Sequence, residues 1–216
     1  NQWDIDELVY VDISRDKNYD SRRDDHKINR INSIEDVLEV VSKECFMPLT
    51  FGGGVRDLET IKKYLKNGAD KVILNTMLHT NAEAVKEAVQ IFGSQAIVAG
   101  IDYRIIKDEI CFFIENGTKK IEFNLKQLSD YILELGCGEV FLTSIDRDGS
   151  GDGYDLKTIE EVVIQFSIPV VACGGALQIF DFEQVAEIEA ISGIAAGNMF
   201  HFTENIYPRS KKKLRQ

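Results

Sequence analysis

Two acids and a glycine end the β-rich run Leu142-Thr-Ser-Ile-Asp-Arg-Asp-Gly149. Glycines also end the next two apolar runs, at Gly174-Gly175 and at Gly197-Asn198. Where a strand leads into a helix, glycines let backbone N–H groups approach an anion, and the helix N-terminus adds the positive end of its dipole. The pattern therefore predicts an enzyme that binds a phosphorylated metabolite.

This glycine-rich region has a counterpart in the first half of the chain. Phe51-Gly-Gly-Gly54 and Asn75 are echoed by Ala172-Cys-Gly-Gly175 and Asn198, with similar helical segments between them. Gly-Gly pairs alone also serve as tight turns, but matched sets in two halves predict two phosphate sites, and so a long substrate with a phosphate at each end. The first cradle comprises Gly53, Gly54, Asn75 and Thr76, and the second Asp148, Gly149, Gly174, Gly175, Gly197 and Asn198.

Asp102 closes the apolar run that starts at Ala96 and is the candidate catalytic residue. A carboxyl group there could give or take protons, with a pKa raised by partly apolar surroundings. Asp12 and Asp146 end equivalent runs, where aspartate is as often a helix cap or loop organiser. The histidines, His26, His79 and His201, have no nucleophile at a suggestive spacing and are expected to be structural or surface residues.

Three charged residues, Glu7, Lys71 and Glu139, stand at the beginnings of predicted strands. The beginnings of parallel strands meet at the mouth opposite the active face. Two acids and one base there could ion-pair across the barrel bottom. From the residues alone, the favoured interpretation is that these three charges simply stabilise that face of the protein.

Apolar, β-branched runs alternate with segments of helical period, which predicts a parallel sheet covered by helices. The expected strands are 8–13, 49–51, 71–75, 96–101, 139–144, 169–173 and 193–196, and the expected helices are 33–43, 57–67, 81–92, 125–135, 156–165 and 180–188. An open doubly wound sheet could supply these units, but the internal repeat favours a (β/α)₈ TIM barrel with half-barrel symmetry. We expect one domain over residues 1–216, N-terminally incomplete and lacking the first βα unit. The polar segment Arg15–Arg30 is either a surface loop or a lid over the barrel mouth.

The composition excludes several classes of function. The formal net charge of −11 argues against nucleic-acid binding, and no apolar run reaches the roughly 20 residues that span a bilayer. The cysteines, at 45, 111, 137 and 173, show no disulfide or zinc spacing, which favours a reducing, cytoplasmic setting. We expect no metal and no cofactor.

Six strings together resemble the HisF-type cyclase subunit of imidazole glycerol phosphate synthase. They are Gly52-Gly-Gly-Val-Arg-Asp57, Gly68-Ala-Asp-Lys-Val-Ile-Leu-Asn-Thr76, Phe92-Gly-Ser-Gln-Ala96 with Ile101-Asp102, Leu142-Thr-Ser-Ile-Asp-Arg-Asp-Gly149, and Ala172-Cys-Gly-Gly175. The resemblance covers nearly the whole chain. It implies a barrel that takes ammonia from a glutaminase partner and acts on a bisphosphorylated ribulosyl substrate, with Asp102 as one of two acid/base aspartates. It also implies that Glu7, Lys71 and Glu139 form the gate through which ammonia enters.

The chain also departs from that family's pattern. Asn198 stands where the family usually has serine, and the aspartate of the first strand is absent from the sequence given. The Arg15–Arg30 segment, 44–48 and 207–211 look more like a divergent branch associated with surface-polysaccharide gene sets. The alternative function is therefore an ammonia-channelling subunit that works with a glutaminase and a sugar amidotransferase.

Overall fold

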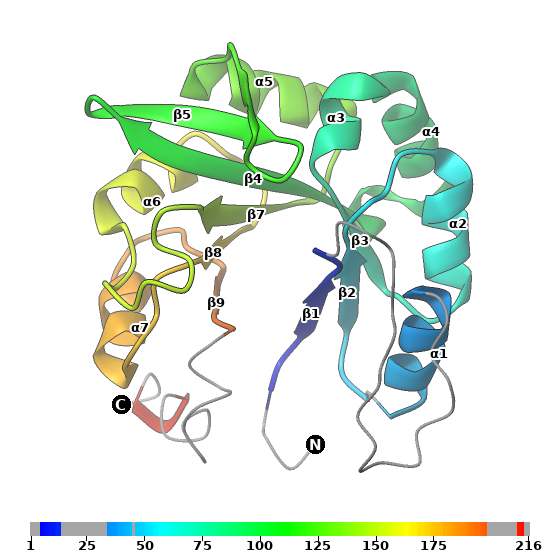
Figure 1. The fold of residues 1–216 in the computed structure, drawn as a ribbon, viewed down its shortest axis with the longest axis horizontal. Helices are drawn as coiled ribbons and strands as arrows, with labels where there is room; N and C mark the ends of the chain where they lie inside the picture. The colour runs from blue at the N-terminus through cyan, green and yellow to red at the C-terminus, as the bar shows by residue number, and fades with distance from the viewer. Residues whose placement is uncertain (1–4, 14–33, 45, 198–210, 214–216) are drawn as a thin grey trace.

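The computed structural model describes residues 5–13, 34–44, 46–197 and 211–213. Its central feature is a curved sheet of parallel strands that pair side by side in chain order (Figure 1). The parallel strands are β1 (Leu8–Val11), β2 (Leu49–Gly52), β3 (Lys71–Leu74), β4 (Ile97–Ile106), β7 (Glu139–Ser144), β8 (Val170–Cys173) and β9 (Gly193–Ala195). Strands β1 and β9 end the sheet, and among the described residues no pairing joins them.

Helices follow the strands and lie on the outer side of the curved sheet (Figure 1). They are α1 (Ile34–Glu44), α2 (Leu58–Lys66), α3 (Thr76–Thr80), α4 (Ala82–Phe92), α5 (Leu125–Leu135), α6 (Leu156–Val163) and α7 (Ile179–Ala186), with a short 3₁₀ turn η1 at Ser94–Ala96. Parallel strands with helices on their outer face confirm the predicted barrel class. Each predicted strand and helix corresponds to one of these elements with small differences at its ends, except that β4 continues five residues beyond its predicted end. The short helix α3 was not predicted.

Local sequence signals set several helix boundaries. The Asp57 side chain accepts from Thr60 N–H at 2.7 Å, which caps α2. Asn124 and Gln127 form a reciprocal capping box that starts α5. The same helix ends at Gly136, which adopts a left-handed conformation with φ 82°.

The apolar residues form two separate clusters. The larger cluster lies between the sheet and the helices and includes the fully buried Ile61, Ile97 and Ile132. A smaller cluster consists of Ile73, Val98 and Phe141, packed by Val9, Val171, Cys173 and Ala195. Side chains alternate between the two faces of a strand, so this second set lines the inner, concave face of the sheet. We call it the lumen cluster.

An antiparallel extension of β4 was not predicted from the sequence. Strand β4 continues to Ile106 and turns back into β5 (Glu109–Ile114), which pairs with β6 (Lys119–Ile121). The turn places Lys107 and Asp108 at φ 53° and 65°, as a two-residue hairpin turn requires. The Asn116-Gly117 pair at the second turn was an available hairpin signal. Strand β5 lies against β4 at the edge of the barrel mouth (Figure 1).

Several predicted features lie outside the described residues: the Arg15–Arg30 segment with His26, residue Asn198, and His201. Within the described ranges, no helix combines the length and the apolar character needed to cross a membrane. In the same ranges, no group of three or more His, Cys, Asp or Glu side chains is arranged to hold a metal ion.

Candidate active site

The described members of both cradles follow the carboxyl ends of parallel strands. Gly53 and Gly54 follow β2, Asn75 follows β3, and Gly174 and Gly175 follow β8. Strands β2, β3, β4, β7 and β8 all run parallel. The two predicted cradles therefore lie on one rim of the sheet, which is the active rim of this architecture.

Asp102 lies on the concave side of this rim. It is two residues beyond Gly100 and four beyond Val98 of the lumen cluster, so all three share one strand face. Burial, together with the negative charge of Asp148, raises the pKa of the Asp102 carboxyl to about 6. A carboxyl group with this pKa is suited to both donating and accepting protons near neutral pH.

Two residues beside Asp102 were missed by the sequence analysis. Thr143 is the register partner of Asp102 on β7, and Cys173 is the register partner of Thr143 on β8. The three side chains form a row across adjacent strands at the mouth. Burial raises the pKa of the Cys173 thiol to about 12, with Asp148 and Asp102 adding to the effect. The thiol is therefore neutral, and the available signal was its place directly before Gly174-Gly175.

In the first cradle, the side chains of Asn75 and Thr76 are engaged within the protein. Asn75 Nδ2 donates to Gly100 O at 3.1 Å and to Phe113 O at 3.2 Å. Thr76 Oγ1 accepts from the Glu115 N–H at 3.0 Å. These bonds hold the β5–β6 hairpin against the rim. A phosphate here would rely on backbone N–H groups and on charge from elsewhere in the mouth.

The cradle glycines fall into two groups by what surrounds them. A Cβ atom at Gly53 would lie 2.1 Å from Asp12 O, and one at Gly175 would lie 2.1 Å from Gly153 O. Both positions need glycine because another segment of backbone packs there. At Gly54 and Gly197 a Cβ would have no neighbour within 4 Å among the described residues, so these positions border open space.

The second cradle contains Asp148, whose negative charge raises the pKa of Asp102. The Asp148 N–H donates to Ser144 O at 2.9 Å, so that N–H is already satisfied. The Asp148 carboxylate contributes to the raised pKa of Asp102. A phosphate in this cradle would therefore depend on the N–H groups of its glycines, while the Asp148 side chain is electrostatically coupled to Asp102.

At the opposite mouth, the three predicted charges come together. Lys71 Nζ lies 2.9 Å from Glu7 Oε2 and 2.7 Å from Glu139 Oε2. Glu7 also accepts a hydrogen bond from the Thr50 hydroxyl, a partner that the sequence analysis did not include. Burial opposes the charged form of Lys71, but its hydrogen bonds to Glu139 and Glu7 outweigh it, and the pKa of Lys71 is raised.

The lumen cluster separates this ion-paired mouth from Asp102. On β7, Glu139, Phe141 and Thr143 face inward in turn, from the charged mouth through the apolar lumen to the level of Asp102. The arrangement is a polar plug, an apolar interior and an acid at the far end. An unpaired ion is costly to bury in such an apolar interior.

His79, the described histidine, has a structural environment. Its ring stacks on Tyr131 with centroids 5.5 Å apart and lies 5.8 Å from the Phe123 ring. Burial lowers the pKa of His79. The side chain packs between α3, α5 and the segment after β6, as expected for a structural histidine.

The model of the histidine biosynthesis protein family matches residues 2–205. A Pseudomonas aeruginosa protein, named provisionally as imidazole glycerol phosphate synthase subunit hisF2, is 35% identical over 203 residues, covering 94% of this chain and 76% of its own. The imidazole glycerol phosphate synthase subunit HisF of a Hydrogenobaculum species is 34% identical over 212 residues, which is 98% of this chain and 80% of that one. The HisF subunit of Bacillus cereus is 33% identical over 216 residues, covering all of this chain and 81% of its own. From the family match, the extent of these similarities and the barrel architecture, we conclude that the chain belongs to the histidine biosynthesis protein family.

Proposed function

We propose that this protein is the cyclase subunit of imidazole glycerol phosphate synthase. Its HisF relatives are named as subunits of that enzyme. It acts as an ammonia-dependent lyase and cyclase on a bisphosphorylated ribulosyl aminoimidazole carboxamide intermediate. The products are imidazole glycerol phosphate and aminoimidazole carboxamide ribotide. The observation that carries the proposal is the partly buried Asp102, with a pKa of about 6, on the same rim as two glycine-rich strand ends.

Each part of the site has a role in this reaction. Asp102 transfers protons as bonds to the ribulosyl carbons rearrange, and its raised pKa lets it act as both acid and base. The cradles hold the two ends of the substrate through backbone N–H groups, so that the reacting carbons lie over the lumen. Cys173, neutral beside Asp102, is a weak hydrogen-bond donor and adds no second charge.

Ammonia is supplied at the opposite mouth by a glutaminase subunit. Lys71, Glu7 and Glu139 form the gate, where paired charges offer polar contacts to ammonia. The apolar lumen beyond them favours neutral ammonia over ammonium, because an unpaired charge is costly to bury there. The nitrogen thus reaches the Asp102 side without passing through bulk water.

The proposal is tested by incubating the protein with the bisphosphorylated substrate and an ammonium salt and measuring the formation of imidazole glycerol phosphate. We expect ammonia-dependent turnover by the wild-type protein, and its loss in Asp102→Asn. Substrate binding without turnover would reject the cyclase assignment and favour the ammonia-channelling subunit that serves a sugar amidotransferase.

A further inference from the structure

Arg104 is a cation at the barrel mouth that neither cradle includes. It follows Asp102 by two residues on β4, so both side chains leave the strand on the same face. At a rise of about 3.3 Å per residue, their Cα atoms are about 6.6 Å apart along the strand. Arg104 therefore follows the candidate acid on the same face of the strand, farther out toward the rim.

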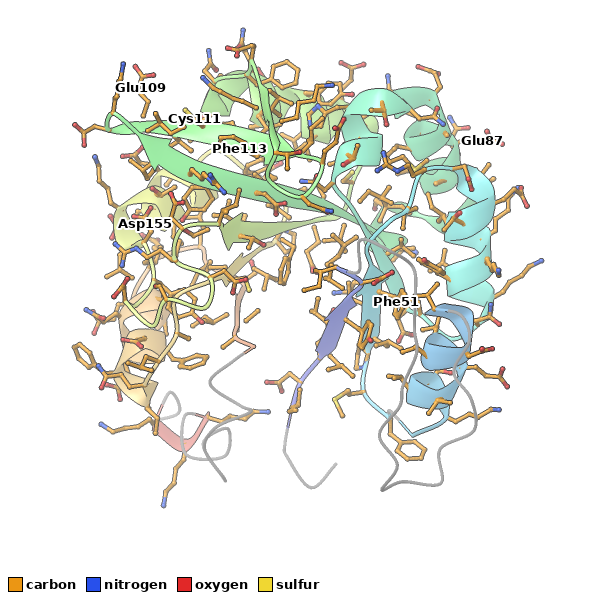
Figure 2. All side chains as sticks on the ribbon, in the orientation of Figure 1. Phe51, Glu87, Glu109, Cys111, Phe113 and Asp155 are labelled. Carbon is orange, nitrogen blue, oxygen red and sulfur yellow. The ribbon has the colours of Figure 1, made fainter. Side chains whose placement is uncertain are left out.

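The surroundings of Arg104 hold its side chain over the mouth. Its guanidinium carbon lies 5.4 Å from the centroid of the Phe113 ring, in a cation–π contact. Phe113 is the register partner of Asp102 on β5 and is labelled beside β4 in Figure 2. The guanidinium also lies 3.9 Å from the position that a Cβ atom would take at Gly117. The hairpin thus covers one side of Arg104.

One N–H group of this guanidinium has no acceptor within the described part of the chain. Arg104 Nε is buried and makes no hydrogen bond among the described residues. Its ion-pair partner, Asp146 Oδ1, is 3.6 Å away, which is beyond hydrogen-bond length. A buried N–H without an acceptor is costly, more so on a charged group. The arrangement is explained if an anionic ligand supplies the acceptor.

The amide of Asn75 and the acids Asp102 and Asp148 supply no cation for a phosphate bound at the mouth. The amide donors of Asn75 are occupied by Gly100 O and Phe113 O. Asp102 and Asp148 place two acids in the mouth, and the whole chain has a net charge of −11. A dianionic phosphate therefore needs a local cation. Arginine is well suited because its planar N–H groups match phosphate oxygens.

From this geometry we infer that Arg104 binds a phosphate group of the substrate, and that Asp146 forms an ion pair with the Arg104 guanidinium when the substrate is absent. The inference rests on the proposed function for the identity of the substrate. It adds a binding residue outside the two glycine-rich cradles. It also assigns Asp146, at the end of β7, the role of a competing anion.

Substitutions of Arg104 and of Asp146, which should change the KM in opposite directions, test this role. Arg104→Met removes the cation but keeps a long side chain, and we expect the KM of the phosphorylated substrate in ammonium-dependent turnover to rise about 10- to 100-fold. Arg104→Lys, which keeps the charge but not the planar N–H groups, should restore part of the affinity. Asp146→Asn removes the competing carboxylate, so the KM should fall. Lys119→Met is the matched control, because Lys119 is a cation of the same hairpin whose side chain is 59% exposed.

Inorganic phosphate binding, measured by calorimetry at constant ionic strength, separates this inference from the proposed function. Weaker phosphate binding by Arg104→Met than by Lys119→Met, with tighter binding by Asp146→Asn, supports it even if the wild type shows no turnover. A purely structural Arg104 would give lower melting temperatures for both Arg104→Met and Asp146→Asn with unchanged phosphate affinity. That result would overturn the inference, as would equal KM values for wild type and Arg104→Met.

Discussion

Asp148 acts on Asp102 across the barrel mouth, and its negative charge adds to the burial that raises the pKa of Asp102. Asp102 lies on β4, and Asp148 lies in the turn that follows β7. Like charges in one apolar mouth disfavour double ionisation, so one carboxyl group holds its proton at a higher pH than a free aspartate. This relationship leads to the first two predictions.

Asp102→Asn should abolish ammonia-dependent turnover while the protein stays folded. The amide has nearly the same volume but cannot transfer a proton, and a lost general acid or base lowers the rate by about 10²- to 10⁴-fold. Steady-state kinetics with ammonium salt and circular dichroism provide the measurement. Turnover equal to that of the wild type would show that another group moves the proton.

Replacing Asp102 should also change the dependence of stability on pH. Its pKa is about 6 in the folded protein against an ordinary aspartate value of 3.8, so the folded state binds the proton more tightly than the unfolded state. This contribution stabilises the wild type below pH 4, and it is lost as the pH rises from about 4 to 6. At pH 7, Asp102→Asn should therefore be more stable than the wild type by up to about 3 kcal/mol.

Urea unfolding of both proteins at pH 4 and pH 7 measures this difference. The stability advantage of Asp102→Asn should be larger at pH 7 than at pH 4. An advantage that is equal at the two pH values would mean that the carboxyl group titrates normally in the folded protein.

Lys71→Ala should reduce glutamine-dependent turnover, measured with the glutaminase subunit, more than ammonium-dependent turnover. The substitution leaves Glu7 and Glu139 without their shared cation, so their repulsion disturbs the gate but not the distant Asp102. It should also cost about 1–3 kcal/mol of folding free energy, because partly buried carboxylates lose a charged hydrogen-bond donor. Lys62→Ala, in the exposed pair with Glu59, is the control and should change neither rate. Equal losses in the two assays of Lys71→Ala would reject the gate.

Gly54→Ala and Gly175→Ala should separate ligand binding from packing. At Gly54 the added methyl group meets no atom of the described ranges within 4 Å, although φ is +67°. Its cost in stability should be about 1–2 kcal/mol from the left-handed backbone, with weaker binding of the phosphorylated substrate. At Gly175 the methyl group would lie 2.1 Å from Gly153 O, so the loop that precedes α6 must move.

Thermal unfolding and substrate titration of the two glycine variants decide this point. We expect the larger fall in melting temperature for Gly175→Ala. If Gly54→Ala binds substrate as the wild type does, the first cradle does not extend to that position.

The alternation of apolar strands with capped helices predicted the barrel class, because period and caps are local properties. Asp57 illustrates this, since its capping role needs only the three following residues. The hairpin was missed because Ile101 appeared to end its strand, whereas β4 continues to Ile106. That continuation is stabilised by pairing with β5, a contact that the hydrophobic period of β4 does not encode.

The sequence by itself determined which residues end the parallel strands, and so the rim that carries Asp102, Gly54 and Gly175. Only the tertiary structure decided which of them interact. The charge of Asp148 raises the pKa of Asp102, and Thr143 and Cys173 lie in a row with Asp102. Arg104 is held over Phe113, and its Nε finds no acceptor in the part of the chain that the structure describes. The physical reason is that a side chain's neighbours across a sheet depend on strand register and burial, which arise from packing between segments far apart in the chain.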